Sequence, residues 1–214
     1  APILVAQQDV RDDRTSNRIQ ALAFQNGKYV NIATITPPTS LSIYEMALGT
    51  SVKNQDRMYV AYVHNHKIAA FTHSGETLWN TGQEFDGSLN YFEYSDREAI
   101  DTARYYLTQR ILLADTDNNG MNEVIAVKNI NSNPSFMEKS KRYKRGYISC
   151  LEWDDTNALR LKWKTIEEQG YISDMAVADA TNDGKADLIF TVVTQTGAML
   201  KKTSNSYLVI QQLP

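Results

Sequence analysis

The sequence has few of the residues that carry nucleophilic, acid–base and cross-linking chemistry. It contains one cysteine and three histidines among 214 residues. The lone Cys150 has no partner for an internal disulfide, and its place in the alternating stretch 147–153 predicts a small buried hydrophobic residue. His64 and His66 lie on a predicted hairpin turn, so we interpret them as exposed turn residues and not as metal ligands. No nucleophile, base and orienting residue form a set, so we predict no catalytic residue, no cofactor-binding residue and no enzyme activity.

Long apolar runs and a strong net charge are also missing. No stretch approaches the roughly 18–20 apolar residues that a membrane-spanning helix needs. The formal net charge of −3 gives no electrostatic reason to expect nucleic acid or an anionic membrane as a partner. The basic run 139–145 is predicted to be a solvated loop, with phosphate or acidic sugar binding as the alternative. Residues 1–5 lack the pattern of a signal peptide and are predicted to begin a strand.

The most informative stretch is Asp115–Glu123. Oxygen-bearing side chains stand at positions 1, 3, 5 and 9, position 7 can offer its carbonyl, and glycine at position 6 permits a sharp turn. The predicted ligands are Asp115, Asp117, Asn119, Met121 and Glu123. This spacing suits Ca2+, which prefers oxygen ligands. Short apolar segments, 110–114 and 124–127, flank the loop, which predicts a strand on either side where an EF-hand would have helices.

The same arrangement returns 64 residues later, between the apolar segments 175–178 and 188–193. The corresponding ligands are Asp179, Thr181, Asp183, Lys185 through its carbonyl, and Asp187. Each loop carries three carboxylates at the four side-chain positions. A glutamate reaches an ion bidentately more easily than an aspartate, and Thr181 is a weak neutral ligand. We therefore expect the loop at Asp115 to bind more tightly.

A third copy, 49–57, keeps the flanking strands but has lost the ligands. Lys53 and Arg57 replace the oxygens at positions 5 and 9, so we expect no ion there. One of these two cations is expected to occupy the place of the ion and to contact backbone carbonyls or a carboxylate. A preserved strand pattern at a period of about 65 residues indicates a repeat architecture and suits a propeller blade with insertions.

The two intact loops resemble the calcium loops of the FG-GAP/VCBS repeat family, whose copies form β-propeller blades. The segment 75–79, Gly-Glu-Thr-Leu-Trp, is similar to the outer hairpin of quinoprotein-like propeller repeats. The resemblance implies an all-β fold of propeller blades with Ca2+ as its metal. An isolated calcium loop in another β fold is the alternative.

The predicted organisation is a single β-propeller domain or propeller fragment over residues 1–214. The blades are approximately 1–36, 41–82, 108–167 and 171–214, and the insertions are 83–107, 130–145 and 194–205. Their strands number three, four, four and three. We predict a helix over 96–104 in the first insertion, with the surrounding tyrosines anchoring it or forming a binding surface. Asn26-Gly27 between alternating runs predicts a hairpin turn.

Incomplete first and last blades would leave apolar faces uncovered. We therefore expect another polypeptide, or the remainder of a precursor, to complete the propeller; a self-closed small propeller is the alternative. The predicted function is that of a non-enzymatic, calcium-stabilised structural or interaction module of an exported assembly, periplasmic, outer-surface or extracellular, where calcium is millimolar. The alternatives are a catalytic propeller, either a polysaccharide lyase or a quinoprotein-like oxidoreductase, and a sugar- or protein-binding adhesin.

Overall fold

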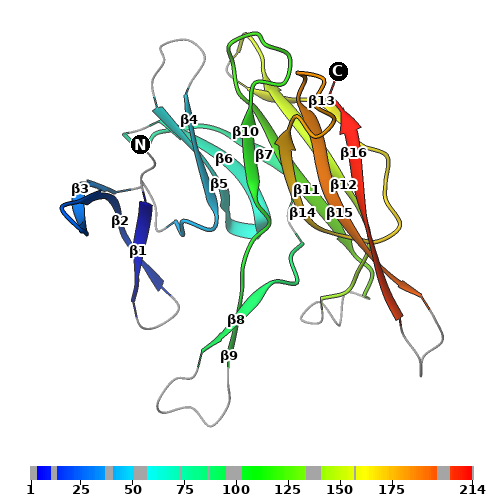
Figure 1. The fold of residues 1–214 in the computed structure, drawn as a ribbon, viewed down its shortest axis with the longest axis horizontal. Coiled ribbons are helices and arrows are strands. Elements are labelled where there is room, and N and C mark those ends of the chain that lie inside the picture. The colour runs from blue at the N-terminus through cyan, green and yellow to red at the C-terminus, as the bar shows by residue number, and fades with distance from the viewer. Residues whose placement is uncertain are drawn as a thin grey trace.

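The structure is a computed structural model that describes residues 4–10, 14–36, 41–50, 57–72, 74–85, 87–94, 103–133, 141–156, 158–196 and 203–213. Over these residues the chain forms antiparallel sheets and one 3-10 turn, η1 (His64–His66). The prediction of an all-β chain is confirmed (Figure 1). Within the same residues, no helix is both long and apolar enough to cross a membrane.

Apart from one two-stranded hairpin, the described residues form four sheets of three or four strands, and in each sheet sequential strands are neighbours. The first contains β1 (Leu4–Val10), β2 (Arg14–Gln25) and β3 (Lys28–Ile35). The second contains β4 (Met46–Thr50), β5 (Arg57–Val63), β6 (Lys67–Thr72) and β7 (Thr77–Glu84). The third contains β10 (Ile111–Ala114), β11 (Glu123–Asn131), β12 (Tyr143–Trp153) and β13 (Leu159–Lys164). The fourth contains β14 (Tyr171–Ala178), β15 (Asp187–Thr196) and β16 (Thr203–Gln212).

The predicted strand numbers of three, four, four and three are confirmed for these sheets. The predicted turn between β2 and β3 is present, with Asn26 at φ 49° and Gly27 at φ 80°. Two consecutive positive φ values give the turn a twist that matches the paired strands, which is why Asn-Gly is favoured there. Gln25 accordingly pairs with Lys28.

The first insertion forms a hairpin of β8 (Tyr91–Tyr94) and β9 (Ala103–Tyr106). The predicted helix over 96–104 is therefore wrong at Ala103 and Arg104, while residues 96–102 lie outside the described part of the chain. Cross-strand aromatic pairs outweigh the local helix signal. Tyr91 packs on Tyr106 with ring centroids 5.4 Å apart, and Phe92 stacks on Tyr105 at 5.0 Å. These aromatic residues thus contact one another across the hairpin.

The other two predicted insertions begin and end within strands. β11 continues to Asn131 and β12 starts at Tyr143, inside the predicted insertion 130–145. β15 continues to Thr196 and β16 starts at Thr203, inside the predicted insertion 194–205. Backbone pairing between β11 and β12, and between β15 and β16, therefore extends into both segments.

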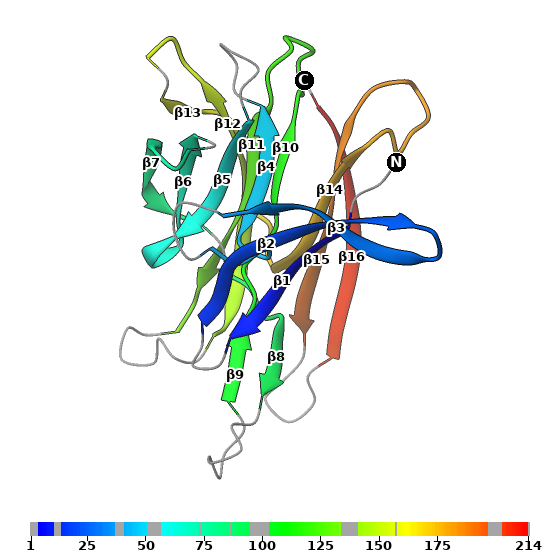
Figure 2. The same ribbon diagram turned by 90° about the vertical axis from the view of Figure 1, so that its left-hand side faces the viewer.

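The third sheet is covered on both faces (Figures 1 and 2). Val124 and Ala126 on β11 face the second sheet, whereas Ile125 and Val127 face the fourth, and all four have no exposed surface. Alternate side chains of a strand point to opposite faces, so only a sheet between two others buries every residue of such a run. Two apolar cores, one on each face, therefore hold the second, third and fourth sheets together.

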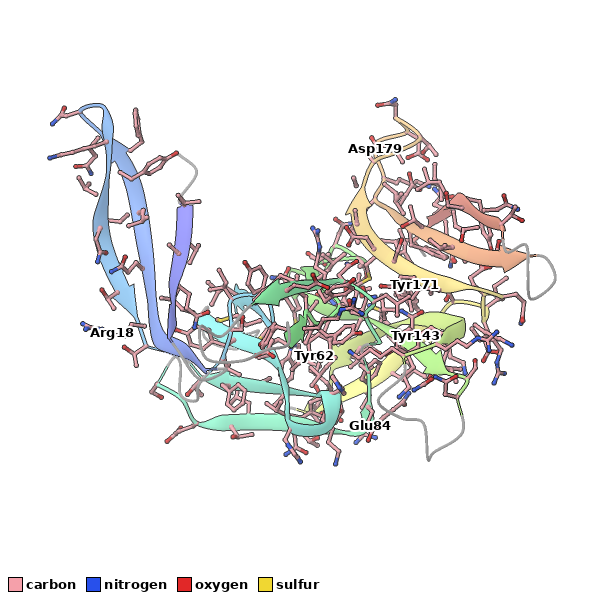
Figure 3. All side chains as sticks on the ribbon, turned by 90° about the horizontal axis from the view of Figure 1, so that it is seen from below. Arg18, Tyr62, Glu84, Tyr143, Tyr171 and Asp179 are labelled. Carbon is pink, nitrogen blue, oxygen red and sulfur yellow. The ribbon has the colours of Figure 1, made fainter. Side chains whose placement is uncertain are left out.

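The first sheet lies at the end of the row (Figure 3). Gln7 of β1 joins it to the segment that leads into the second sheet: its Nε2 donates to the Leu41 carbonyl at 2.7 Å, and its Oε1 accepts from the Ile43 N–H at 2.8 Å. Phe24 and Tyr29, beside the β2–β3 turn of the first sheet, are exposed. Over the described residues the sheets form an open row, without a closed barrel or propeller.

Candidate metal centre

The loop between β10 and β11 is curled by its own side chains. Asp115 Oδ1 accepts from the N–H of Asn119 at 3.0 Å, and its Oδ2 accepts from the N–H of Gly120 at 2.9 Å. Asn119 Oδ1 accepts from the N–H of Met121 at 2.7 Å. Asn118 and Gly120 adopt positive φ, as the sharp turn requires. The sequence-predicted spacing therefore produces a closed loop with its oxygens gathered at one side.

Three predicted ligands come together in this loop. Oxygens of Asp115, Asp117 and Glu123 all lie within 4.8 Å of one another. Glu123 begins β11 and is 1% exposed, and its Oε2 accepts from the N–H of Thr116 at 2.7 Å and from its hydroxyl at 2.6 Å. One carboxylate oxygen of Glu123 thus orders the loop, and the other lies 3.5 Å from the ammonium nitrogen of Lys162. These three carboxylates could therefore hold a metal ion.

The loop between β14 and β15 has the same design. Asp179 accepts from the N–H groups of Asp183 at 3.1 Å and Gly184 at 3.0 Å, and Asp183 accepts from the N–H of Lys185 at 2.9 Å. Asn182 and Gly184 repeat the positive φ values at the corresponding positions. The local sequence therefore specifies the same backbone path in both loops.

Asp187 closes the second loop as Glu123 closes the first. Its Oδ2 accepts from the N–H groups of Ala180 at 3.0 Å and Thr181 at 3.2 Å, and from the Thr181 hydroxyl at 3.2 Å. Its Oδ1 is buried and has no hydrogen-bond partner among the described residues. A buried carboxylate oxygen without a donor is costly unless a cation neutralises it. Asp187 Oδ1 is the observation that best fits a metal at this loop.

The third copy departs from the loop geometry at its first position. Gly49 and Thr50 belong to β4 and pair with Met58 and Arg57 of β5. In the intact first loop, by contrast, the last pair is Ala114 and Glu123, so loop positions 1 to 8 lie outside the ladder. The prediction of flanking strands is confirmed, and Gly49 lies in a strand where a loop position was predicted. Residues 51–56, including Lys53, lie outside the described part of the chain, and so does the predicted cation contact.

Sequence reasoning missed two charged residues of the first loop, Lys162 and Glu152. Lys162 on β13 places its Nζ 2.6 Å from Asp117 Oδ2, 3.5 Å from Glu123 Oε1 and 3.4 Å from Glu152 Oε2. The hydrogen bond from Lys162 holds the pKa of Asp117 below its ordinary value. Desolvation alone would lower the pKa of Lys162, but the hydrogen bond to Asp117 and the charge of Glu123 raise it overall. The pattern of β13 gave no sign of this contact, because it depends on strand pairing.

The remaining predicted residues are placed as follows. His64 and His66 form the turn η1, as expected. Lys141 Nζ lies 4.1 Å from the centroid of the Tyr106 ring, and Arg145 is part of β12 and pairs with Glu167 at 2.9 Å. Residues 143–145 therefore belong to a strand where a loop was predicted, whereas Arg142, Lys144 and Arg145 are exposed to solvent, as predicted.

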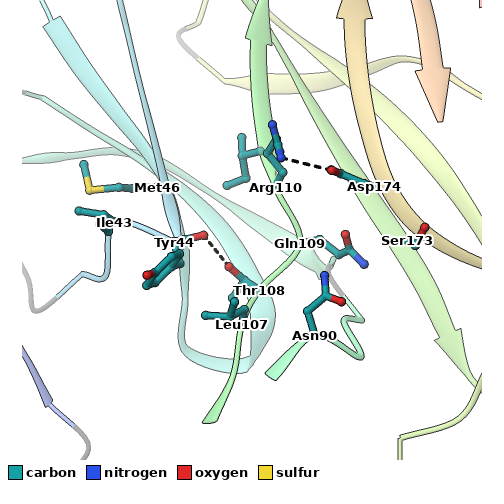
Figure 4. A pocket seen from close by; sticks show the side chains of 11 residues that line it. Ile43, Tyr44, Met46, Asn90, Leu107, Thr108, Gln109, Arg110, Ser173 and Asp174 are labelled. Atoms are coloured by element: carbon teal, nitrogen blue, oxygen red, sulfur yellow. Dashed lines mark hydrogen bonds and ion pairs between the residues drawn. The ribbon is translucent and has the colours of Figure 1, made fainter. Parts of the chain in front are cut away.

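A separate pocket of about 280 Å³ lies near the starts of β4, β10 and β14 (Figure 4). Arg110 Nη2 and Asp174 Oδ2 form an ion pair at 3.2 Å across it. Thr108 donates its hydroxyl to the Tyr44 carbonyl at 2.8 Å, and the ring of Tyr44 is exposed. The pocket is thus polar on one side and aromatic on another, and it lies apart from the two loops.

Comparison with known proteins gives no family assignment. No protein-family model matches the chain, and no curated protein matches its sequence.

Proposed function

We propose that this chain is a calcium-stabilised module built from β-propeller blades, without enzyme activity, in an exported or cell-surface assembly. The observation that carries the proposal is the buried Asp187 Oδ1, which has no donor among the described residues and lies in a loop with calcium-ligand spacing. The acidic cluster of the first loop supports it. Asp115, Asp117, Asn119, Met121 and Glu123 would hold one ion, and Asp179, Thr181, Asp183, Lys185 and Asp187 the other.

The blade interpretation is supported by the arrangement of the four meandering sheets. The first strands of the second, third and fourth sheets, β4, β10 and β14, are neighbours, as the innermost strands of successive blades would be. The fourth sheet leaves Leu208 and Ile210 exposed on its last strand. A further polypeptide, or more of the same chain, would cover this face and continue the row.

Calcium dependence of stability tests the proposal. Binding to the folded state adds roughly 2.7 kcal/mol per site at a hundredfold excess over Kd. One kcal/mol shifts the melting temperature by about 2–4 °C in a chain of this size. Saturating calcium should therefore raise the melting temperature by about 5–11 °C per occupied loop relative to excess EGTA.

Asp187→Asn provides the matched test, because it keeps the shape of the side chain and removes its charge. It should remove the share of the calcium effect that belongs to the second loop, whereas Glu84→Gln, an exposed carboxylate on β7, should leave the effect intact. Equal melting temperatures in calcium and in EGTA, with the metal content verified, would refute the proposal.

The alternatives differ in what the purified protein would carry or do. A quinoprotein-like oxidoreductase would show quinone absorbance, and a polysaccharide lyase would cleave acidic glycans. A sugar-binding adhesin has a specific candidate site in the pocket of Tyr44, Arg110 and Asp174 (Figure 4). Protein that carries calcium and shows none of these properties supports the structural module.

A further inference from the structure

The two loops differ in the residues that surround them. In the third sheet, Val124 of β11 pairs with Leu151 of the antiparallel strand β12. The residue before Val124, Glu123, therefore lies beside the residue after Leu151, Glu152. The corresponding neighbour of Asp187 in the fourth sheet is the neutral Gln212. The first loop therefore has a fourth carboxylate close to its three predicted carboxylate ligands.

Lys162 is the cation that balances this extra charge. It lies on β13, the fourth strand of the third sheet, whereas the fourth sheet has three strands among the described residues. The second loop has a neutral contact instead, in which Gln212 Nε2 donates to Asp183 Oδ2 at 3.3 Å. The local sequences of the loops are alike, so the difference in their surroundings comes from the sheet around each.

The ammonium group of Lys162 and a bound calcium ion would compete for the same oxygens. A calcium ion needs its oxygens at about 2.3–2.6 Å. Lys162 Nζ already lies 2.6 Å from Asp117 Oδ2 and 3.5 Å from Glu123 Oε1, and its side chain is only 17% exposed, so solvent screens it weakly. Calcium binding must displace Lys162 from these oxygens or take place against its charge.

Glu152 provides a place for the displaced ammonium. Its Oε2 is 3.4 Å from Lys162 Nζ, and its side chain is 42% exposed. The lysine can therefore keep an ion pair with Glu152 while it releases Asp117 and Glu123. In the absence of calcium it supplies a counter-charge that keeps the first loop ordered, and the second loop has no such counter-charge among its described contacts.

Given the proposed calcium binding, we propose that Lys162 is an internal competitor for the metal of the first loop and makes that loop the weaker calcium site. This order is the reverse of the one expected from the ligand residues alone. The first loop then fills only at higher calcium concentration, and the second loop, which has no such counter-charge among its described contacts, gains stability from calcium at lower concentration.

Calorimetric titration with calcium chloride tests this in the full chain. Asp179→Asn disables the second loop and isolates the first, and Lys162→Gln is then added to it. The added substitution should tighten calcium binding by about tenfold, within the usual range of coupling between two bound ligands. Lys162→Arg keeps the charge and should keep the weak affinity. Lys164→Gln, on the same strand with its Nζ 5.2 Å from the centroid of the Tyr147 ring, is the matched control and should change nothing.

Thermal melts of the same proteins provide a second measurement. In EGTA, Lys162→Gln should melt below the parent protein because the first loop has lost its counter-charge, and calcium should restore more of its stability. The role of Lys162 would be overturned if Lys162→Gln left calcium binding at the first loop unchanged or weaker. Normal calcium binding at the second loop, measured in Asp115→Asn, would then leave the proposed function standing. An absence of calcium binding in all of the proteins would overturn both this role and the proposed function.

Discussion

Asn129 on β11 is predicted to be a main contributor to the cohesion of the third and fourth sheets. Its side chain is buried, and its Oδ1 accepts from the Ile172 N–H on β14 at 2.9 Å. Its Nδ2 donates to the carbonyl of Ile172 at 2.9 Å and to that of Gly87 at 2.8 Å. The side-chain amide thus pairs with the backbone of a neighbouring sheet as a strand would. A Cβ at position 146 would overlap Asn129 Oδ1, so Gly146 leaves the space for this contact.

The expected cost of Asn129→Ala follows from the partners that remain. Gln109 Nε2 also donates to the Ile172 carbonyl at 3.1 Å and to the Gly87 carbonyl at 3.3 Å, so both carbonyls keep a donor. The buried Ile172 N–H loses the side-chain acceptor it has in the native structure. An unpaired buried donor costs about 1–3 kcal/mol, and the weakened carbonyl contacts add about 1 kcal/mol. We expect a loss of about 2–4 kcal/mol, or a melting temperature about 4–16 °C lower.

Urea unfolding followed by tryptophan fluorescence measures this loss. Asn131→Ala, an exposed position on the same strand, is the control and should cost well under about 1 kcal/mol. Asn129→Asp adds a diagnostic pH dependence, because its second oxygen would face two carbonyls and the neutral acid would be favoured in the folded state. Its folded pKa would then exceed the unfolded value, so the variant should recover stability as the pH falls from 7 to 5. An Asn129→Ala protein as stable as the control would refute the reasoning.

Two further predictions concern a buried thiol and an acidic turn. Cys150 is fully buried, and burial raises the pKa of its thiol to about 12. The native protein should therefore not react with a thiol reagent at pH 8, whereas the unfolded protein should react. Rapid labelling of the folded chain would contradict this prediction. Asp154 accepts hydrogen bonds from the Thr156 hydroxyl, from Arg160 and from the N–H groups of Thr156 and Ala158, which hold its pKa well below the usual range. A depressed folded pKa stabilises the protein above the unfolded value of about 3.9 and loses this effect as the pH falls below it. Asp154→Asn should therefore lose less stability than the native chain on acidification between about pH 5 and pH 2, and parallel curves would count against the contact.

Local signals determined much of the fold. The alternation of apolar residues located the strands of the four sheets, and their numbers are as predicted. Asn26-Gly27 located a hairpin turn, and the alternating stretch around Cys150 gave its burial. The two acidic loops close through hydrogen bonds between residues at most seven positions apart, so their sequence alone specifies their shape. These features depend on contacts within a strand, a turn or a single loop.

Only the tertiary structure decided which residues meet across strands and sheets. Lys162 reaches Asp117 from 45 positions away, and Asn129 reaches Ile172 from 43, because strand pairing and sheet packing join distant segments. The β8–β9 hairpin replaced part of a predicted helix, since its aromatic pairs form only when the two strands align. The pairing of Gly49 with Met58 depends in the same way on the register between β4 and β5. Local sequence therefore specified the elements and the loops, whereas register and packing set the electrostatic surroundings of each loop.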